Sequence, residues 1–172
     1  RLAACIDLEA CRRCGIEVRQ GSGNPVAPTE LTWMLILASS RRLLPYARQL
    51  ERGRWQRSAE RVEDERLGRV MHGRTLGIWG FGKIGSRVAA IGRAFGMQVL
   101  VHGRAQSRAA VETADYEFVT ERREFLARVD VLSLHLRLDP ATRHIVTAAD
   151  LAAMRPDALL VNTSRAELLA PD

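Results

Sequence analysis

The sequence contains few aromatic residues and one lysine, and both features argue against a nucleic-acid-binding protein. Aromatic side chains make up 5% of the 172 residues, too few to stack the bases of a single-stranded nucleic acid. Lys83 is the only lysine, so the net charge of +6 comes from arginines, which are scattered rather than gathered in one basic tract. We therefore expect no nucleic-acid partner, although a basic balance also suits a ligand that carries phosphate.

Long apolar runs are also missing, which excludes a membrane-spanning segment. The longest, residues 31–38, contains Thr32 and is far shorter than the roughly 20 residues that a helix needs to cross a bilayer. No secretory signal peptide is recognisable, and the sequence begins with Arg1 rather than methionine. We expect no membrane partner, and we expect the sequence to start inside a longer protein.

Cysteine is scarce, and its spacing does not predict a metal site. The three cysteines are Cys5, Cys11 and Cys14, of which the last two form a lone C-x-x-C. A structural zinc site needs a second such pair or suitably spaced histidines, and a thioredoxin-like site needs a surrounding βαβ unit. We expect no metal, and the odd cysteine count without a secretion signal predicts a reducing, cytoplasmic location.

The first 25 residues predict a short helix, a short strand and a loop. Residues 7–14 form the predicted helix, with Asp7 as its N-cap and Gly15 as its stop. The alternation of residues 16–20 predicts the strand, and the glycines and proline of residues 21–25 predict the loop.

A long helix and a charged connection are predicted next. The helix runs from about Pro28 to about Gly53, with a kink at Pro45, and residues 56–72 form a surface connection. The apolar positions of the helix include Leu31, Met34, Leu35, Ala38, Leu43 and Leu44.

From residue 73 onward, predicted strands and helices alternate. Apolar runs predict strands at residues 76–79, 98–102, 129–135 and 158–162. Helices are predicted after Gly85, at 121–128 and at 147–154. This alternation predicts an α/β fold of the Rossmann type, with a doubly wound parallel sheet.

A glycine-rich motif, Gly80-Phe81-Gly82-Lys83-Ile84-Gly85, connects the first of these strands to its helix. In a dinucleotide site, the first glycine of G-x-G-x-x-G permits a tight turn, the second lets a pyrophosphate approach the backbone, and the third lets the helix pack closely on the sheet. The free N–H groups at the helix start then face the phosphates. We expect all six residues to contact a nicotinamide cofactor.

The end of the second strand predicts which cofactor is preferred. NAD sites usually place a carboxylate there, which binds the ribose 2′-hydroxyl. Gly103 occupies that position here, Arg104 follows it, and Ser107 and Arg108 add a further donor and charge. Because arginine pairs well with phosphate, we favour NADP over NAD and expect all four residues to contact the cofactor.

Several separated motifs resemble the D-isomer-specific 2-hydroxyacid dehydrogenase family. They are TLGIWGFGKIG at 75–85, AFGM at 94–97, DVLSLHL at 130–136, the pair at 142–143, LAAMRP at 151–156 and LVNTSR at 160–165. Earlier, APTEL at 27–31 is similar to the segment that connects the two domains of these enzymes. The resemblance implies hydride transfer between NAD(P) and a small 2-hydroxy or 2-keto acid, in a homodimer formed with the help of the connecting helix.

The resemblance also implies residue roles and boundaries. Arg165 matches the catalytic arginine, whose guanidinium can hold a substrate carboxylate and polarise the carbonyl that accepts hydride. His135, Leu136, Asn162 and Thr163 match positions beside the cofactor. Thr142 either contacts the cofactor or caps a turn. Residues 1–26 are then a remnant of the substrate domain, 27–72 the interdomain helix and charged connection, and 73–172 the cofactor domain, incomplete at its C-terminus.

The sequence departs from the family pattern in ways that leave a second function open. Arg137 stands where the family commonly has proline, and the catalytic glutamate and the acid/base histidine of the family lie beyond residue 172. Since keto-acid reduction needs a proton donor, we expect this chain alone to be inactive. The alternative is a non-catalytic NAD(H)-binding module like the corepressors related to the family. A short-chain dehydrogenase is excluded, because no tyrosine precedes Lys83 by four residues.

Overall fold

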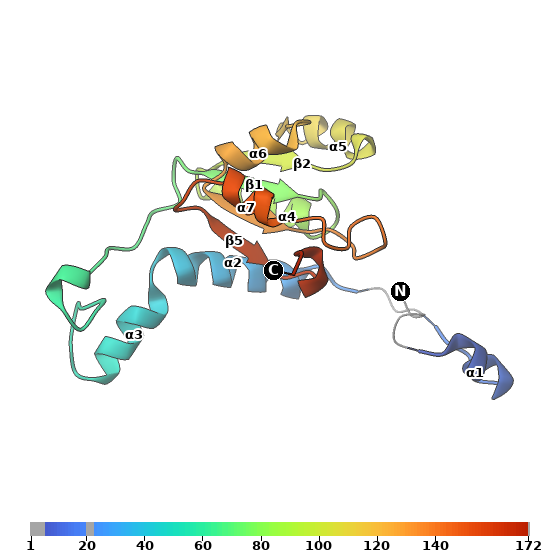
Figure 1. Cartoon of the computed structure of the whole chain (residues 1–172), viewed down its shortest axis with the longest axis horizontal. Coiled ribbons are helices and arrows are strands. Elements are labelled where there is room, and N and C mark those ends of the chain that lie inside the picture. Colours follow the sequence, from blue (N-terminus) through green and yellow to red (C-terminus); the bar gives the residue numbers. More distant parts are fainter. Residues whose placement is uncertain (1–5, 20–22, 172) are drawn as a thin grey trace.

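A parallel five-stranded sheet forms the centre of the protein (Figure 1). The computed structural model describes residues 6–19 and 23–171, so the sequence expectations for Cys5 and for residues 20–22 lie outside the described residues. The strand order is β3-β2-β1-β4-β5, with every pair parallel, which confirms the predicted Rossmann-type fold. The strands are β1 (Thr75–Trp79), β2 (Gln98–His102), β3 (Glu117–Phe118), β4 (Val131–Leu134) and β5 (Leu159–Asn162).

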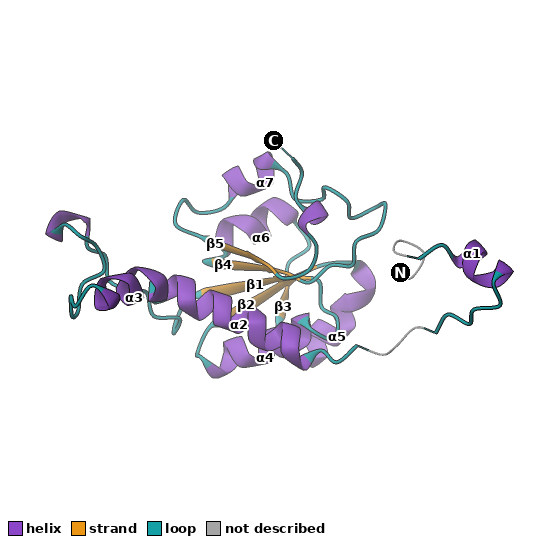
Figure 2. Ribbon diagram, turned by 90° about the horizontal axis from the view of Figure 1, so that it is seen from below, coloured by secondary structure: helices purple, strands orange, loops and turns teal. Residues whose placement is uncertain are grey.

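Helices cover both faces of the sheet, as expected for a doubly wound fold (Figure 2). One face carries α2 (Val26–Ser40), α4 (Gly85–Ala94) and α5 (Arg108–Thr113); the other carries α6 (Arg122–Arg128) and α7 (Ala148–Ala153). Short 3₁₀ turns, η2 (Val62–Asp64), η3 (Ala105–Ser107) and η4 (Ala166–Leu168), lie in the connections. No helix among the described residues is long and apolar enough to span a membrane.

Alternation along the strands divides the buried side chains into two cores. In β1, Leu76 and Ile78 pack toward α2, α4 and α5, whereas Trp79 packs toward α6. Phe125 of α6 is fully buried against Trp79. Because both faces are covered, the strands are apolar on both sides, which is why continuous apolar runs located them correctly in the sequence.

The predicted long helix is two helices, and the break between them does not lie at the predicted kink. The helix is interrupted at Arg42, which has φ 54°, and not at Pro45. Pro45 lies in the first turn of α3 (Leu43–Glu51), where a missing N–H costs little.

The buried side of α2 is formed by Thr29, Thr32, Trp33 and Ile36, whereas Leu31, Met34 and Leu35 are exposed. The Trp33 Nε1 donates to the Val88 carbonyl of α4 at 3.2 Å. This contact orients α2 so that the indole, rather than the leucines, faces the protein interior.

The N-terminal helix is confirmed, but the strand predicted after it is not. The Asp7 side chain accepts from the N–H groups of Glu9 and Ala10 and so caps α1 (Leu8–Arg13). Residues 16–19 form no strand, because no segment of the described chain pairs with them. The helix α1 buries no residue and lies apart from the sheet (Figure 1). The sequence analysis did not predict α5 and β3.

Candidate functional site

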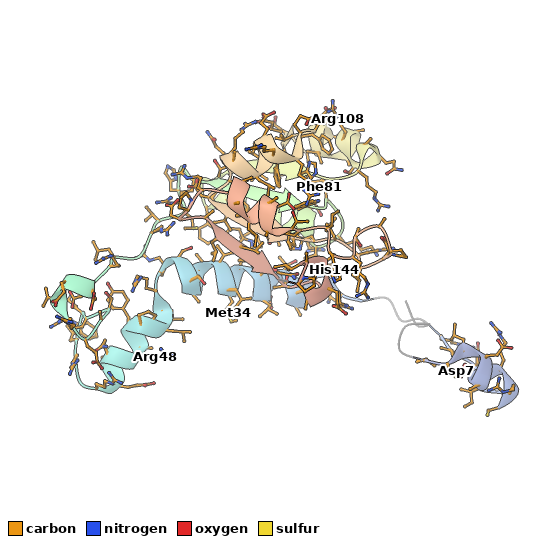
Figure 3. The ribbon with its side chains drawn as sticks, in the orientation of Figure 1. Asp7, Met34, Arg48, Phe81, Arg108 and His144 are labelled. Atoms are coloured by element: carbon orange, nitrogen blue, oxygen red, sulfur yellow. The ribbon has the colours of Figure 1, made fainter. Side chains whose placement is uncertain are left out.

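The carboxyl ends of the strands bring the predicted site residues to one edge of the sheet. From β1 the chain continues to β2 and β3 on one side and then crosses to β4 and β5 on the other, and ligands of such sheets bind at this switch point. Gly80 follows β1, Gly103 follows β2, His135 follows β4 and Thr163 follows β5. Figure 3 labels Phe81 of the glycine loop and Arg108 at the start of α5.

The three motif glycines have different structural requirements. Gly80 has φ 104°, its N–H donates to the His102 carbonyl at 2.9 Å, and a Cβ added to it would lie 2.7 Å from the His135 oxygen. A Cβ on Gly85 would overlap the Gly80 carbonyl oxygen. Gly82 is exposed, and a Cβ there would meet nothing within 4 Å. The first and third glycines are therefore fixed by packing, and the second leaves the backbone open to a ligand.

The start of α4 suits the phosphates of a dinucleotide. Its N-cap, Ile84, makes no side-chain capping hydrogen bond. The Ser86 N–H donates to the Gly82 carbonyl, and the other N–H groups at the helix start can face an anion. Lys83 is exposed beside them. The loop and helix start therefore fit a pyrophosphate in both shape and charge.

The region after β2 has one arginine without an internal partner and one with partners. The Arg108 Nη2 donates to Thr120 Oγ1 at 2.5 Å, and its guanidinium lies 5.0 Å from the centroid of the Phe118 ring. The Ser107 hydroxyl donates to the Arg104 carbonyl at 2.7 Å. The Arg104 side chain is exposed and forms no hydrogen bond or ion pair with the described residues. Arg104 is thus the better placed of the two arginines to meet a ligand.

His135 is held in its uncharged form at the end of β4. Its Nε2 lies 2.9 Å from the hydroxyl of Ser133, and its buried Nδ1 has no partner among the described residues. Burial lowers the pKa of His135 from 6.5 to about 4, because desolvation penalises the imidazolium. The neighbouring Leu136 packs beneath Gly80, where its Cδ2 would lie 3.1 Å from an added Cβ.

A tight turn after β5 presents Arg165. The Asn162 amide donates to the Arg165 carbonyl at 2.8 Å and accepts from the Ser164 N–H at 3.0 Å. The Ser164 hydroxyl donates to the Leu134 carbonyl at 2.9 Å, which fixes the turn to the end of β4. The Arg165 side chain is exposed, and its Nη1 donates to the carbonyl of the adjacent Ser164 at 2.8 Å. The sequence analysis missed Ser164, because only the folded structure shows its long-range partner.

Two of the predicted cofactor residues have their hydroxyls engaged within the protein. Thr163 Oγ1 lies 2.8 Å from Thr32 Oγ1, which joins the turn after β5 to α2. Thr142 Oγ1 accepts from the Asp139 N–H at 2.8 Å and donates to the Arg137 carbonyl at 2.5 Å. Thr142 therefore closes a turn, the second of the two roles expected for it, and its contact with a cofactor stays a prediction.

The cavities lie away from the glycine loop. One of about 120 Å³ is at the amino edge of the sheet and is lined by residues that include Arg69, Arg74, Asp130 and Asp157, whose charges are largely paired with one another. Another, of about 380 Å³, lies between α7 and β5. The candidate cofactor site lies apart from both, at the carboxyl edge of the sheet. No cluster suited to a metal ion occurs within 6–19 and 23–171.

The burial of His135 predicts a pH-dependent stability. The unfolded chain binds a proton near pH 6.5 and the folded chain only near pH 4, so the free energy of unfolding falls as the pH drops through this window, by up to about 1.4 kcal/mol per pH unit. Urea unfolding at pH 7, 6 and 5 measures it. His135→Asn should flatten the dependence, whereas His144→Asn, at an exposed position, should not; equal slopes in all three proteins would contradict the assignment.

Known proteins with related sequences are enzymes of about twice this length or more. The chain is 39% identical to the glyoxylate reductase of Aeropyrum pernix over 95% of its own residues and 49% of that protein. It is 33% identical to the D-3-phosphoglycerate dehydrogenase of Methanocaldococcus jannaschii over 95% of its residues and 30% of that protein. The chain thus spans about half the length, or less, of these curated relatives.

Solved structures and a family model agree with the sequence matches. The phosphoglycerate oxidoreductase of Vibrio cholerae O395 superposes with a TM-score of 0.89 at 53% identity, over 96% of this chain and 51% of that one. The D-lactate dehydrogenase of Escherichia coli gives 0.83 at 30% identity, over 96% and 50%. The family model for the NAD-binding domain matches residues 33–172. The chain belongs to the D-isomer-specific 2-hydroxyacid dehydrogenase family and carries its NAD-binding domain.

Proposed function

We propose that the protein is an oxidoreductase that transfers hydride between a nicotinamide cofactor and a small 2-hydroxy or 2-keto acid. The observation that carries the proposal is the glycine loop at the β1–β4 switch point, with the Arg165 turn on the same edge of the sheet. Family membership supports it, as do relatives named glyoxylate reductase and phosphoglycerate dehydrogenase.

Different residues around the switch point contact different parts of the cofactor. The backbone of Gly80–Gly85 and the start of α4 bind the pyrophosphate. At the ends of β4 and β5, the cofactor would lie beside His135, Leu136, Asn162 and Thr163. When bound, the nicotinamide supplies the hydride chemistry. The protein then orients the reacting groups.

Alanine substitutions in the glycine loop separate folding from cofactor binding. Gly82→Ala should keep the stability of the wild type, because its Cβ meets no atom within 4 Å, but should weaken NADH binding about tenfold, the equivalent of ~1.4 kcal/mol, by obstructing the pyrophosphate. Gly85→Ala should lower the free energy of unfolding by about 1–3 kcal/mol through overpacking.

Fluorescence titration with NADH and urea unfolding measure the two effects. Unchanged NADH affinity in Gly82→Ala would show that the loop is only a turn and would remove the basis of the proposed function.

NADP is the favoured cofactor in this proposal, and Arg104 selects it. No carboxylate follows β2 to repel a 2′-phosphate, because Gly103 occupies the position. Arg104 is exposed next to it, and a guanidinium forms strong charge-assisted hydrogen bonds with phosphate. Ser107 and Arg108 lie beside it, but both have internal hydrogen bonds, so their contribution is secondary.

The cofactor preference is measured by titrating NADPH and NADH at one fixed salt concentration, because salt screens phosphate contacts. Wild type should bind NADPH several-fold more tightly, and Arg104→Ala should lose most of that preference while keeping its NADH affinity. Arg123→Ala, which removes the same charge from an exposed position on α6, serves as the control. Tighter binding of NADH by the wild type would assign NAD as the cofactor instead.

Arg165 is the proposed catalytic residue of this chain. Its turn is fixed through Asn162 and Ser164, while its guanidinium remains exposed at the carboxyl edge. A guanidinium can bind a substrate carboxylate through two parallel hydrogen bonds and stabilise the negative charge that develops on the carbonyl oxygen.

Arg165→Lys tests whether catalysis needs the planar guanidinium or only its positive charge. Lysine keeps the positive charge but loses the planar fork, so kcat/KM for 2-keto acids should fall about 100-fold while the Kd for reduced cofactor changes little. Keto-acid-dependent oxidation of NADPH by the full-length protein measures the effect. A variant with unchanged kcat/KM would exclude Arg165 from catalysis.

The domain boundaries and the homodimer are part of the same proposal. Residues 1–26 belong to a substrate domain, 27–72 connect the domains, and 73–172 bind the cofactor. Apolar side chains lie exposed along α2 and α3, among them Met34, Leu43 and Leu44. An exposed apolar surface of this kind favours association, and it supports a homodimer through these helices.

A further inference from the structure

A stack of three side chains joins the glycine loop to the far end of α5. The ring of Phe81, labelled in Figure 3, meets the ring of Tyr116 edge to face, with centroids 5.9 Å apart and planes at 69°. On Tyr116 lies the guanidinium of Arg93, 4.0 Å from the ring centroid. The three residues come from the loop after β1, the segment before β3 and the last turn of α4.

The outer side of the glycine loop has few packing contacts. Gly82 and Lys83 are exposed, and a Cβ on Gly82 would meet no atom within 4 Å. Phe81 is partly buried and packs against the core beneath α4. Its ring is therefore the side chain that anchors the first half of the loop, and its aromatic partner among the described residues is Tyr116.

Tyr116 is itself fixed by Arg93. The Arg93 Nη2 donates to the carbonyls of Ala114 at 2.7 Å and Asp115 at 2.6 Å, and so it satisfies carbonyl groups at the end of α5. Asp115 has φ 58°, which turns the chain sharply before Tyr116. The Tyr116 N–H donates to the Val111 carbonyl at 3.1 Å. The backbone and the ring of Tyr116 are thus both held in place.

We infer that Tyr116, fixed by Arg93, is a positioning residue for the pyrophosphate loop. It holds Phe81 so that the N–H groups near Gly82 keep the arrangement that binds a diphosphate before the cofactor arrives. Such preorganisation raises affinity by reducing the ordering needed on binding. The inference rests on the proposed dinucleotide binding, and it assigns part of the cofactor affinity to a residue that need not touch the cofactor.

The test compares Tyr116→Ala with two matched variants. Tyr116→Phe keeps the ring, and the tyrosine hydroxyl makes no hydrogen bond with the described residues, so this variant should bind like the wild type. Ile91→Ala removes a side chain from α4 that packs against the same core, and it reports the effect of lost packing alone.

Calorimetric titrations with NADH, ADP-ribose and adenosine provide the readout. Tyr116→Ala should weaken NADH and ADP-ribose about fivefold, the range expected for losing an aromatic pair, and should leave adenosine unchanged, since adenosine lacks the diphosphate.

The outcomes distinguish the inference from the proposed function. If wild type binds NADH and Tyr116→Ala binds NADH and ADP-ribose equally well, the positioning role is overturned and the proposed function stands. Equal weakening of all three ligands, or equal weakening in Ile91→Ala, would show a general structural role and would also overturn it. Failure of the wild type to bind either NADH or NADPH would overturn the proposed function and, with it, the inference.

Discussion

The close approach of α4 to the end of β1 is the constraint on which the rest of the site depends. A side chain on Gly85 would overlap the Gly80 carbonyl oxygen, and a side chain on Gly80 would collide with His135. With both glycines, the turn brings the start of α4 to the β1–β4 switch point. The helix start, the loop and the ends of β4 and β5 then lie at the same edge of the sheet, and folds of this type bind dinucleotides at that edge.

Several arginines of this basic chain form contacts within the protein. Arg122 pairs with Asp150 and lies over Trp79, Arg128 pairs with Glu117 and Glu124, and Arg93 caps α5. These contacts, each modest in energy where exposed, are structural. Arg104 and Arg165 differ from these in their place, because both follow strands at the carboxyl edge of the sheet. The excess of positive charge alone does not locate the proposed site.

The sequence predicted the elements whose residue pattern is set by local burial and backbone geometry. The strands β1, β2, β4 and β5 were found because burial on both faces requires continuous apolar residues, and the glycine motif was found because its spacing reflects backbone sterics. The two-residue β3 and six-residue α5 are too short for a periodic pattern. The buried face of α2 depends on the hydrogen bond of Trp33 to Val88, and the contacts of Ser164 and Tyr116 join residues distant in sequence. Such tertiary contacts leave no pattern in the surrounding residues.

Mapping amide chemical shifts by NMR while NADH is added tests the central claim most directly, because it locates the ligand residue by residue. The account predicts that the largest changes fall on Gly82, Lys83 and Gly85, with smaller changes at the ends of β2, β4 and β5. Changes confined to the amino-edge cavity around Arg69 and Asp130, with the glycine loop unaffected, would contradict it.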